Sequence, residues 1–90
     1  MARHVKDPND VLDYGHDFAA WLDGDTITDH DITVTPDDAV TVDSSSVDGD
    51  RVIVWLSGGV LDADAEVTFR IVTAGGRTTD RTDRFDIRKK

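Results

Sequence analysis

The 90-residue chain has no cysteine and only two prolines, and it contains no long apolar run. Without cysteine it can form neither a disulfide nor a thiolate metal site. No apolar stretch approaches the roughly 20 residues of a membrane-spanning helix, so we expect no membrane partner. Residues 1–6 also lack the apolar core of a secretion signal, and we therefore expect a soluble protein made in the cytoplasm.

Basic residues are missing from a large part of the chain. Residues 7–50 carry thirteen aspartates and no lysine or arginine, whereas residues 51–90 hold eight basic residues against six acids. The net charge of −9 argues against a nucleic-acid partner, because a phosphate backbone repels an acidic surface. The asymmetry suits a basic partner surface or the basic end of a neighbouring copy. A solvated acidic face that keeps the protein soluble is the plainer interpretation.

Glutamate is nearly absent as well, since eighteen of the nineteen acids are aspartate. Aspartate is poor in helix interiors and common in turns, so this bias predicts many turns and few helices. Apolar residues alternate with polar ones in several segments, and each segment predicts a strand with one wet face. These segments are residues 12–22, 32–35, 40–42, 67–71 and 85–87. The only short helical candidate is residues 17–22.

Residues 52–56 are apolar at every position, which predicts a central strand covered on both sides, with Trp55 as a core anchor. Residues 74–77 contain two consecutive glycines and predict a tight hairpin. Together the segments predict an all-β fold, a single immunoglobulin-like or fibronectin-like β-sandwich of about seven short antiparallel strands. The sandwich is expected over residues 10–90. Residues 1–9 are expected to form an extended N-terminal arm.

The residues that could support catalysis do not form a recognisable constellation. His4, His16 and His30 have no partner at catalytic or metal-binding spacing. The chain contains no serine elbow, no cysteine nucleophile and no phosphate-binding glycine loop. We therefore predict no enzymatic activity, no catalytic residue and no cofactor. His16 shares the apolar parity of its strand and is expected at the core or its rim.

One cluster of carboxylates is the candidate for a metal site. Asp23, Asp25, Asp29 and Asp31 fall within nine residues and offer the oxygen ligands that calcium prefers. The pattern is not that of an EF-hand, because the glycine is misplaced and Val34 occupies the position of the terminal glutamate. Aspartates in loops and strands are usually there without a metal. Calcium is therefore an alternative, and the main prediction is no metal.

Aromatic and basic residues provide the candidates for a protein interface. Trp21 has the opposite parity to its apolar neighbours, so it faces outward unless the strand bends there, and an outward tryptophan is a hot-spot candidate. Basic residues gather at the C-terminal end, where they could meet the acidic residues 7–50 of a neighbouring copy. The candidates are Tyr14, Trp21, Arg84, Arg88, Lys89 and Lys90.

Three stretches recur together in one known family. Lys6–Tyr14 runs on to Trp21–Ile27 and is followed by Val54–Gly59 and then Thr73–Thr78. In this order and at this spacing they resemble the fiber-tail adaptor proteins, short proteins of tailed bacteriophages. The resemblance implies a virion component with a compact β-domain, made in the host cytoplasm, that joins the tail or portal region to fibers or neighbouring tail proteins. Such parts follow cyclic symmetry, so we also expect self-association in a symmetric assembly.

Two other functions remain open at this point. A capsid decoration protein could use the same immunoglobulin-like domain, and the number of copies per particle separates it from an adaptor. A calcium-dependent or carbohydrate-binding adhesion module is the third possibility. A melting temperature that depends on calcium would support its metal-binding version.

Overall fold

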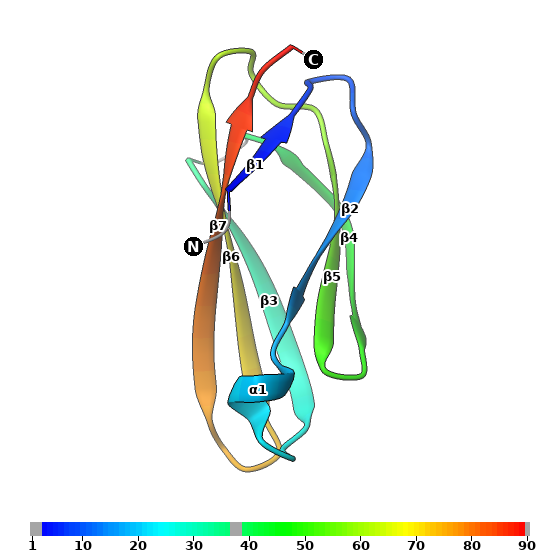
Figure 1. The fold of residues 1–90 in the computed structure, drawn as a ribbon, viewed down its shortest axis with the longest axis vertical. Coiled ribbons are helices and arrows are strands. Elements are labelled where there is room, and N and C mark those ends of the chain that lie inside the picture. Colours follow the sequence, from blue (N-terminus) through cyan, green and yellow to red (C-terminus); the bar gives the residue numbers. More distant parts are fainter. Residues whose placement is uncertain (1–2, 37–38, 90) are drawn as a thin grey trace.

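The computed structural model describes residues 3–36 and 39–89, and the described chain is almost entirely β-structure (Figure 1). Within these residues, seven strands form two sheets that pack face to face, and one short helix follows the second strand. The strands are β1 (Arg3–Lys6), β2 (Leu12–Asp17), β3 (Ile27–Thr35), β4 (Thr41–Asp48), β5 (Arg51–Ser57), β6 (Asp64–Thr73) and β7 (Thr78–Ile87), and the helix is α1 (Ala19–Leu22). The predicted all-β sandwich is confirmed.

The order of strands explains the resemblance to immunoglobulin-like domains. One sheet has the order β1-β7-β6-β3 and the other has the order β2-β5-β4. Apart from β1, these are the two sheets of a constant-type immunoglobulin domain, in which the third, sixth and seventh strands face the second, fifth and fourth. Four of the five strand pairs are antiparallel, but β1 pairs with β7 in parallel. The prediction of antiparallel strands is therefore wrong for that one pair.

The core lies between the two sheets and is built by strict alternation. On β6 the side chains of Val67, Phe69 and Ile71 are buried, and on β7 those of Phe85 and Ile87 are buried. Successive side chains of a strand point to opposite faces, so the intervening polar residues face solvent. The hairpin between these strands begins after Thr73, as the two glycines predict, and Gly76 adopts the positive φ of 82° that glycine tolerates.

The strand β5 departs from its prediction. Val52, Val54 and Leu56 are buried against the other sheet, whereas Trp55 on the opposite face is 43% exposed. No layer of the described chain covers that outer face (Figure 1). The prediction of a strand covered on both sides, with Trp55 as a core anchor, is therefore wrong.

The alternation expected over residues 12–22 ends at Asp17, where the chain turns into α1. The Asp17 carboxylate accepts a hydrogen bond from the backbone N–H of Ala19, which satisfies one of the free donors at the start of the helix. Phe18 and Leu22 are buried, and Asp23 ends the helix in the left-handed conformation with φ of 48°. In a helix, the side chains of Trp21 and Leu22 point in different directions from those that they would take in a strand. The short helical candidate at residues 17–22 is thus where the helix forms.

The first residues of the expected N-terminal arm belong to the folded domain. Arg3–Lys6 forms β1 and pairs with β7 of the same chain, and Lys6 is fully buried. The Lys6 ammonium donates hydrogen bonds to the backbone carbonyls of Asp7 and Gly58. These carbonyls stabilise the buried charge and join β1 to the turn after β5. Within residues 3–36 and 39–89, no helix has the length and apolarity that crossing a membrane would require.

Candidate interaction surface

The stretches of sequence that resemble the adaptor family contact one another in the folded protein. Arg77, from the turn between β6 and β7, places its guanidinium 4.3 Å from the ring centre of Trp21. It donates hydrogen bonds to the carbonyls of Trp21 and Leu22, at 3.3 and 2.7 Å, and to the Asp25 carboxylate at 3.2 Å. Arginine suits this role because its planar group can stack on a ring while its edge donates hydrogen bonds. The contacts fasten α1 to the β6–β7 hairpin, and we call them the Arg77 clasp.

The Asp25 carboxylate accepts hydrogen bonds from several groups around the Arg77 clasp, and these favour its ionised form. Its pKa lies below the ordinary aspartate value, first because of the Thr73 hydroxyl and then because of hydrogen bonds from the backbone of Thr26 and Gly75 and from Arg77. Each of these donors favours the charged form of the carboxylate. The Lys6–Gly58 contact joins the first stretch to the second in a similar way. The stretches that carry the resemblance to the adaptor family therefore make contacts that hold the fold together.

The two aromatic residues proposed for an interface, Tyr14 and Trp21, both pack against other residues of the domain. Tyr14 packs against the rings of His4 and Phe85, with ring centres 5.2 and 4.7 Å away, and those two rings also stack on each other. Trp21 packs against the core on one side and carries Arg77 on the other. The structure therefore places both rings where they stabilise the fold.

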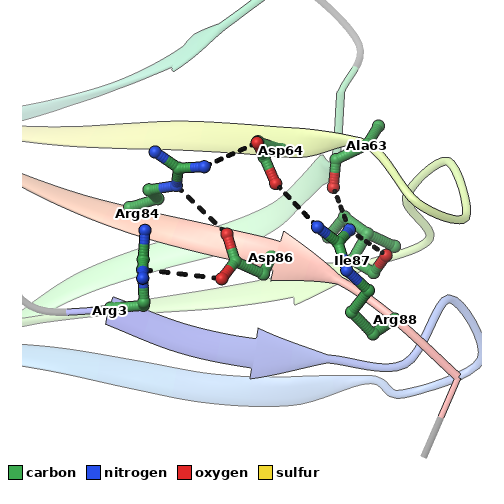
Figure 2. A network of polar contacts seen from close by, with 7 residues as sticks. All are labelled: Arg3, Ala63, Asp64, Arg84, Asp86, Ile87 and Arg88. Carbon is green, nitrogen blue, oxygen red and sulfur yellow. Dashed lines mark hydrogen bonds and ion pairs between the residues drawn. The ribbon is translucent and has the colours of Figure 1, made fainter.

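The basic candidates at the end of the chain are paired with acids of the same chain (Figure 2). Arg84 contacts Asp64 at 2.6 Å and Asp86 at 3.1 Å, Arg88 contacts Asp64 at 3.3 Å, and Arg3 contacts Asp86 at 3.5 Å. The hydrogen bond from Arg84 lowers the pKa of Asp86, and the same contact raises the pKa of Arg84. Much of the positive charge at this end is thus compensated locally.

The two lysines of the candidate interface differ in what the structure says of them. Lys89 is exposed, and Lys90 lies outside the described residues. Their contact with a neighbouring copy stays a prediction.

The candidate calcium ligands serve other purposes in the structure. Asp25 belongs to the Arg77 clasp, while Asp29 and Asp31 each accept a hydrogen bond from the backbone N–H of the next residue. Asp23 ends α1. Across residues 3–36 and 39–89, no group of three or more histidine, aspartate or glutamate side chains is arranged to hold a metal ion. The four carboxylates are therefore not brought together.

Two histidines contact a buried acid on β7. The Asp83 carboxylate is 1% exposed and lies 3.4 Å from His4 Nε2 and 3.8 Å from His16 Nδ1. His16 also packs on the rings of Phe18 and Phe69, at the rim of the core, as its parity predicts. The third histidine contacts the Ser45 hydroxyl at 2.9 Å across the edges of the two sheets. These groups link strands of the sandwich.

The outer face of the β2-β5-β4 sheet carries an exposed tryptophan and is covered by no other element of the described chain. Trp55 and Ile53 point outward from the central strand, because their neighbours in sequence are buried. The residues beside them in register are small: Gly15 on β2 and Ser46 on β4 flank Ile53, and Ser44 flanks Trp55. We call these five residues the Trp55 face.

Acidic residues border the Trp55 face. Asp13 lies beside Trp55 in register, and Asp17 and Asp48 lie on either side of Arg51 at the end of β5. These three carboxylates are exposed and form no ion pair within the described residues. Arg51 leans toward Gly15, where an added Cβ atom would come within 2.7 Å of its Nη2 atom. The border is therefore acidic, with one arginine beside the centre.

The Trp55 face was missed because the apolar run was interpreted as a doubly covered strand. One signal could have identified it. Arg51 and Ser57 share the parity of Trp55, whereas the opposite parity holds only Val52, Val54 and Leu56. Polar residues at both ends of one parity indicate the solvent-facing side of a strand.

A comparison with protein families tests the resemblance to adaptor proteins that these stretches of sequence suggest. Residues 6–85 match the family described as podophage GP4 fiber-tail adaptor protein gp77. The chain belongs to this family. The matched range begins at Lys6 and covers the Arg77 clasp and the Trp55 face. A search of curated proteins found no match. Membership identifies a component of a phage virion with a structural, tail-associated role.

Proposed function

We propose that this protein is a non-enzymatic adaptor that joins the fibers of a podophage to its tail through contacts between subunits. Family membership supports the pairing of fiber and tail. The observation that contributes most from the structure is the Trp55 face, an exposed tryptophan on an otherwise uncovered sheet. Tryptophan is enriched among the residues that contribute most to binding energy at interfaces.

A joining protein needs two surfaces, and the two sheets differ in chemistry. On the outer face of the β1-β7-β6-β3 sheet, Arg70 pairs with Asp80 and Arg84 pairs with Asp64, so opposite charges neutralise each other. Thr68 and Thr82 share a hydrogen bond between these pairs. The Trp55 face instead has an aromatic centre, and the acids at its border form no ion pair within the described residues. Two such different faces suit two different partners, one on each side of the sandwich.

Self-association in a symmetric ring is part of the proposal. The contact expected from the sequence joins the acidic residues 7–50 of one copy to residues 84–90 of the next. Because Arg84 and Arg88 already pair with acids of their own chain, the attraction depends mainly on the last two lysines. Removal of residues 88–90 should then weaken the oligomer in native mass spectrometry. An unchanged oligomer would count against this contact.

The experiment for the adaptor function is a phage with a nonsense codon in the gene for this protein. We expect the purified particles to contain capsid and tail proteins but little fiber protein in quantitative mass spectrometry. Purified wild-type protein should restore fiber attachment when it is added to these particles together with fibers. Particles that carry the normal amount of fiber without this protein would exclude the function.

A further inference from the structure

We propose that the Trp55 face is the docking surface for a basic segment of the tail or fiber protein, with an arginine of that partner stacked on the Trp55 ring. This inference rests on the proposed adaptor function and names the surface and the chemistry of one partner. It concerns a protein partner other than a second copy of this chain.

The centre of the face is accessible from above. Trp55 is 43% exposed although it lies on the central strand of its sheet, a position at which neighbours on both sides could shield it. The neighbours in register on β4 are serines, whereas on β2 Asp13 lies beside Trp55 and the Arg51 side chain lies over Gly15. Short side chains leave the face of a large ring open to a partner. A planar guanidinium or an extended segment of chain fits such a surface.

The charge around the ring selects a basic partner. Asp13 lies beside Trp55, and Asp17 and Asp48 lie further along the same face, none of them paired within the described residues. Arg51 is the one basic residue among them. A partner that buried this surface without positive charge would leave desolvated carboxylates, which is costly. Arginine and lysine side chains would instead form charge-assisted hydrogen bonds with them.

The chain already contains the geometry that we assign to the docked state. In the Arg77 clasp, an arginine lies over Trp21 and donates to the Asp25 carboxylate. Trp55 and Asp13 provide a second tryptophan next to an aspartate, but no arginine of the described residues lies over the Trp55 ring. A cation over a tryptophan face is favourable, and more so when water is excluded. The partner would supply the missing arginine.

A second copy of this chain is a poor source of that arginine. Arg3, Arg70, Arg77, Arg84 and Arg88 each pair with an aspartate of their own chain, whereas Arg51 and Arg81 form no ion pair within the described residues. The whole chain carries a net charge of −9, so a second copy offers this acidic face much less positive charge than a basic segment of another protein does. A basic segment of another protein is therefore the better complement to this face.

The first test adds purified variants, with fibers, to particles that lack this protein and measures both the bound adaptor and the attached fiber. The variants are Trp55→Ala on the face and Leu61→Ala, which removes another exposed apolar side chain between β5 and β6. We expect Trp55→Ala to raise the concentration for half-maximal binding by about tenfold or more, and Leu61→Ala to leave it unchanged. Equal binding of both variants, with matched melting temperatures, would overturn the proposal.

The second test removes charge and uses salt. The double variant Asp13→Asn, Asp48→Asn should bind more weakly than wild type at low salt, and its binding should depend less on salt. The double variant Asp29→Asn, Asp31→Asn is the matched control, because it also removes two charges and both are exposed aspartates on the other sheet. If the two double variants change the salt dependence alike, the acidic border has no specific role and the proposal fails.

The third test identifies the partner inside the virion. A photo-reactive amino acid replaces Ser44, next to Trp55, or Thr33, on the outer face of the other sheet. The proposal predicts a cross-link from position 44 to a peptide rich in arginine or lysine in a tail or fiber protein. A cross-link from position 44 to this chain itself, or to capsid protein, would overturn it. If wild type restores fibers but position 44 gives no tail or fiber product, only the docking surface fails and the adaptor function stands.

Discussion

At the scale of single residues, the same residue type has opposite roles in this chain. Trp21 lies beneath Arg77 and takes part in the contacts that hold α1 to the β6–β7 hairpin. Trp55 instead lies on the exposed outer face of its sheet. Both roles follow from local geometry. A helical turn places Trp21 against the core, and strand alternation places Trp55 on the face of β5 that points away from the core. The sequence left two placements open for Trp21, outward on a straight strand or buried at a bend, and it placed Trp55 in the core because residues 52–56 are apolar at every position.

Core and surface aromatics should therefore differ in their effect on stability. Phe69 is fully buried between the sheets, and Phe69→Ala should lower the free energy of unfolding by about 3–5 kcal/mol. Trp55→Ala leaves the core intact and should change it by about 1 kcal/mol or less. Urea unfolding followed by circular dichroism measures both values. A large loss from Trp55→Ala would show that the ring supports the fold, which contradicts its role as a docking residue.

Asp25 makes the stability of the folded protein depend on pH, mainly through its contact with the Thr73 hydroxyl. The pKa of this carboxyl is lowered in the folded protein, so its stabilising contribution is present above the unfolded-state pKa and is lost as pH falls through the folded-state value. We expect Asp25→Asn to be less stable than wild type at neutral pH. The difference should shrink as the pH falls from about 5 toward about 1.

Unfolding measured at several pH values provides that comparison. Asp23→Asn is a suitable control, since it makes the same change of charge two residues away and Asp23 forms no ion pair with the described residues. A stability difference for Asp25→Asn that is constant over the whole pH range would contradict the lowered pKa of Asp25.

At the scale of elements, the sequence predicted most strands from their alternation but not the place of every element. Residues 67–71 and 85–87 alternate cleanly because each strand has one buried and one wet face, and both were assigned correctly. The first strand is only four residues long and its pattern carries no clear period. Its parallel pairing with β7 depends on a contact between the two ends of the chain, which no local pattern reveals.

The first strand should contribute strongly to stability despite its length. Removal of residues 1–6 would expose the edge of β7, uncover Phe85 from His4 and remove the Lys6–Gly58 contact. We expect a clear fall in melting temperature in differential scanning calorimetry, together with aggregation through the new sheet edge. Removal of residues 89–90, after the end of β7, is the control. Equal melting temperatures for the two truncations would mean that β1 is dispensable.

The candidate site was even less accessible to sequence reasoning. Tyr14 and Trp21 were predicted at an interface because aromatic residues are common there; both pack within the domain, and their contact with a partner stays a prediction. Arg84 and Arg88 stood out as basic, but their partners Asp64 and Asp86 approach only when β6 and β7 pair. The Trp55 face combines residues from three strands, and its register is a property of the folded sheet.

At the scale of the whole molecule, charge is divided between the two sheets. Most of the arginines of β6 and β7 neutralise aspartates of the same chain, whereas the β2-β5-β4 sheet keeps unpaired acids. The protein is 41 Å long and 19 Å across in the other two directions, so the two outer faces lie on opposite sides of a narrow domain. This arrangement is suited to a small part placed between two larger ones.

The unpaired acids predict that salt stabilises the free protein. Repulsion among the carboxylates of an acidic domain opposes folding, and salt screens it. We expect the melting temperature to rise between about 0.01 M and about 0.15 M sodium chloride, a range over which the screening length falls from about 30 to about 8 Å. Calorimetry of the Asp13→Asn, Asp48→Asn variant should show a smaller rise. A melting temperature that falls with salt would indicate that ion pairs dominate instead.

The most direct test of the adaptor account is the number of copies of this protein in purified virions, measured by quantitative mass spectrometry against fiber and capsid proteins of known number. The account predicts a small number that matches the symmetry of the tail and stands in a fixed ratio to the fibers. A number equal to that of the major capsid protein would indicate a decoration protein, and absence from the particle would contradict any virion role.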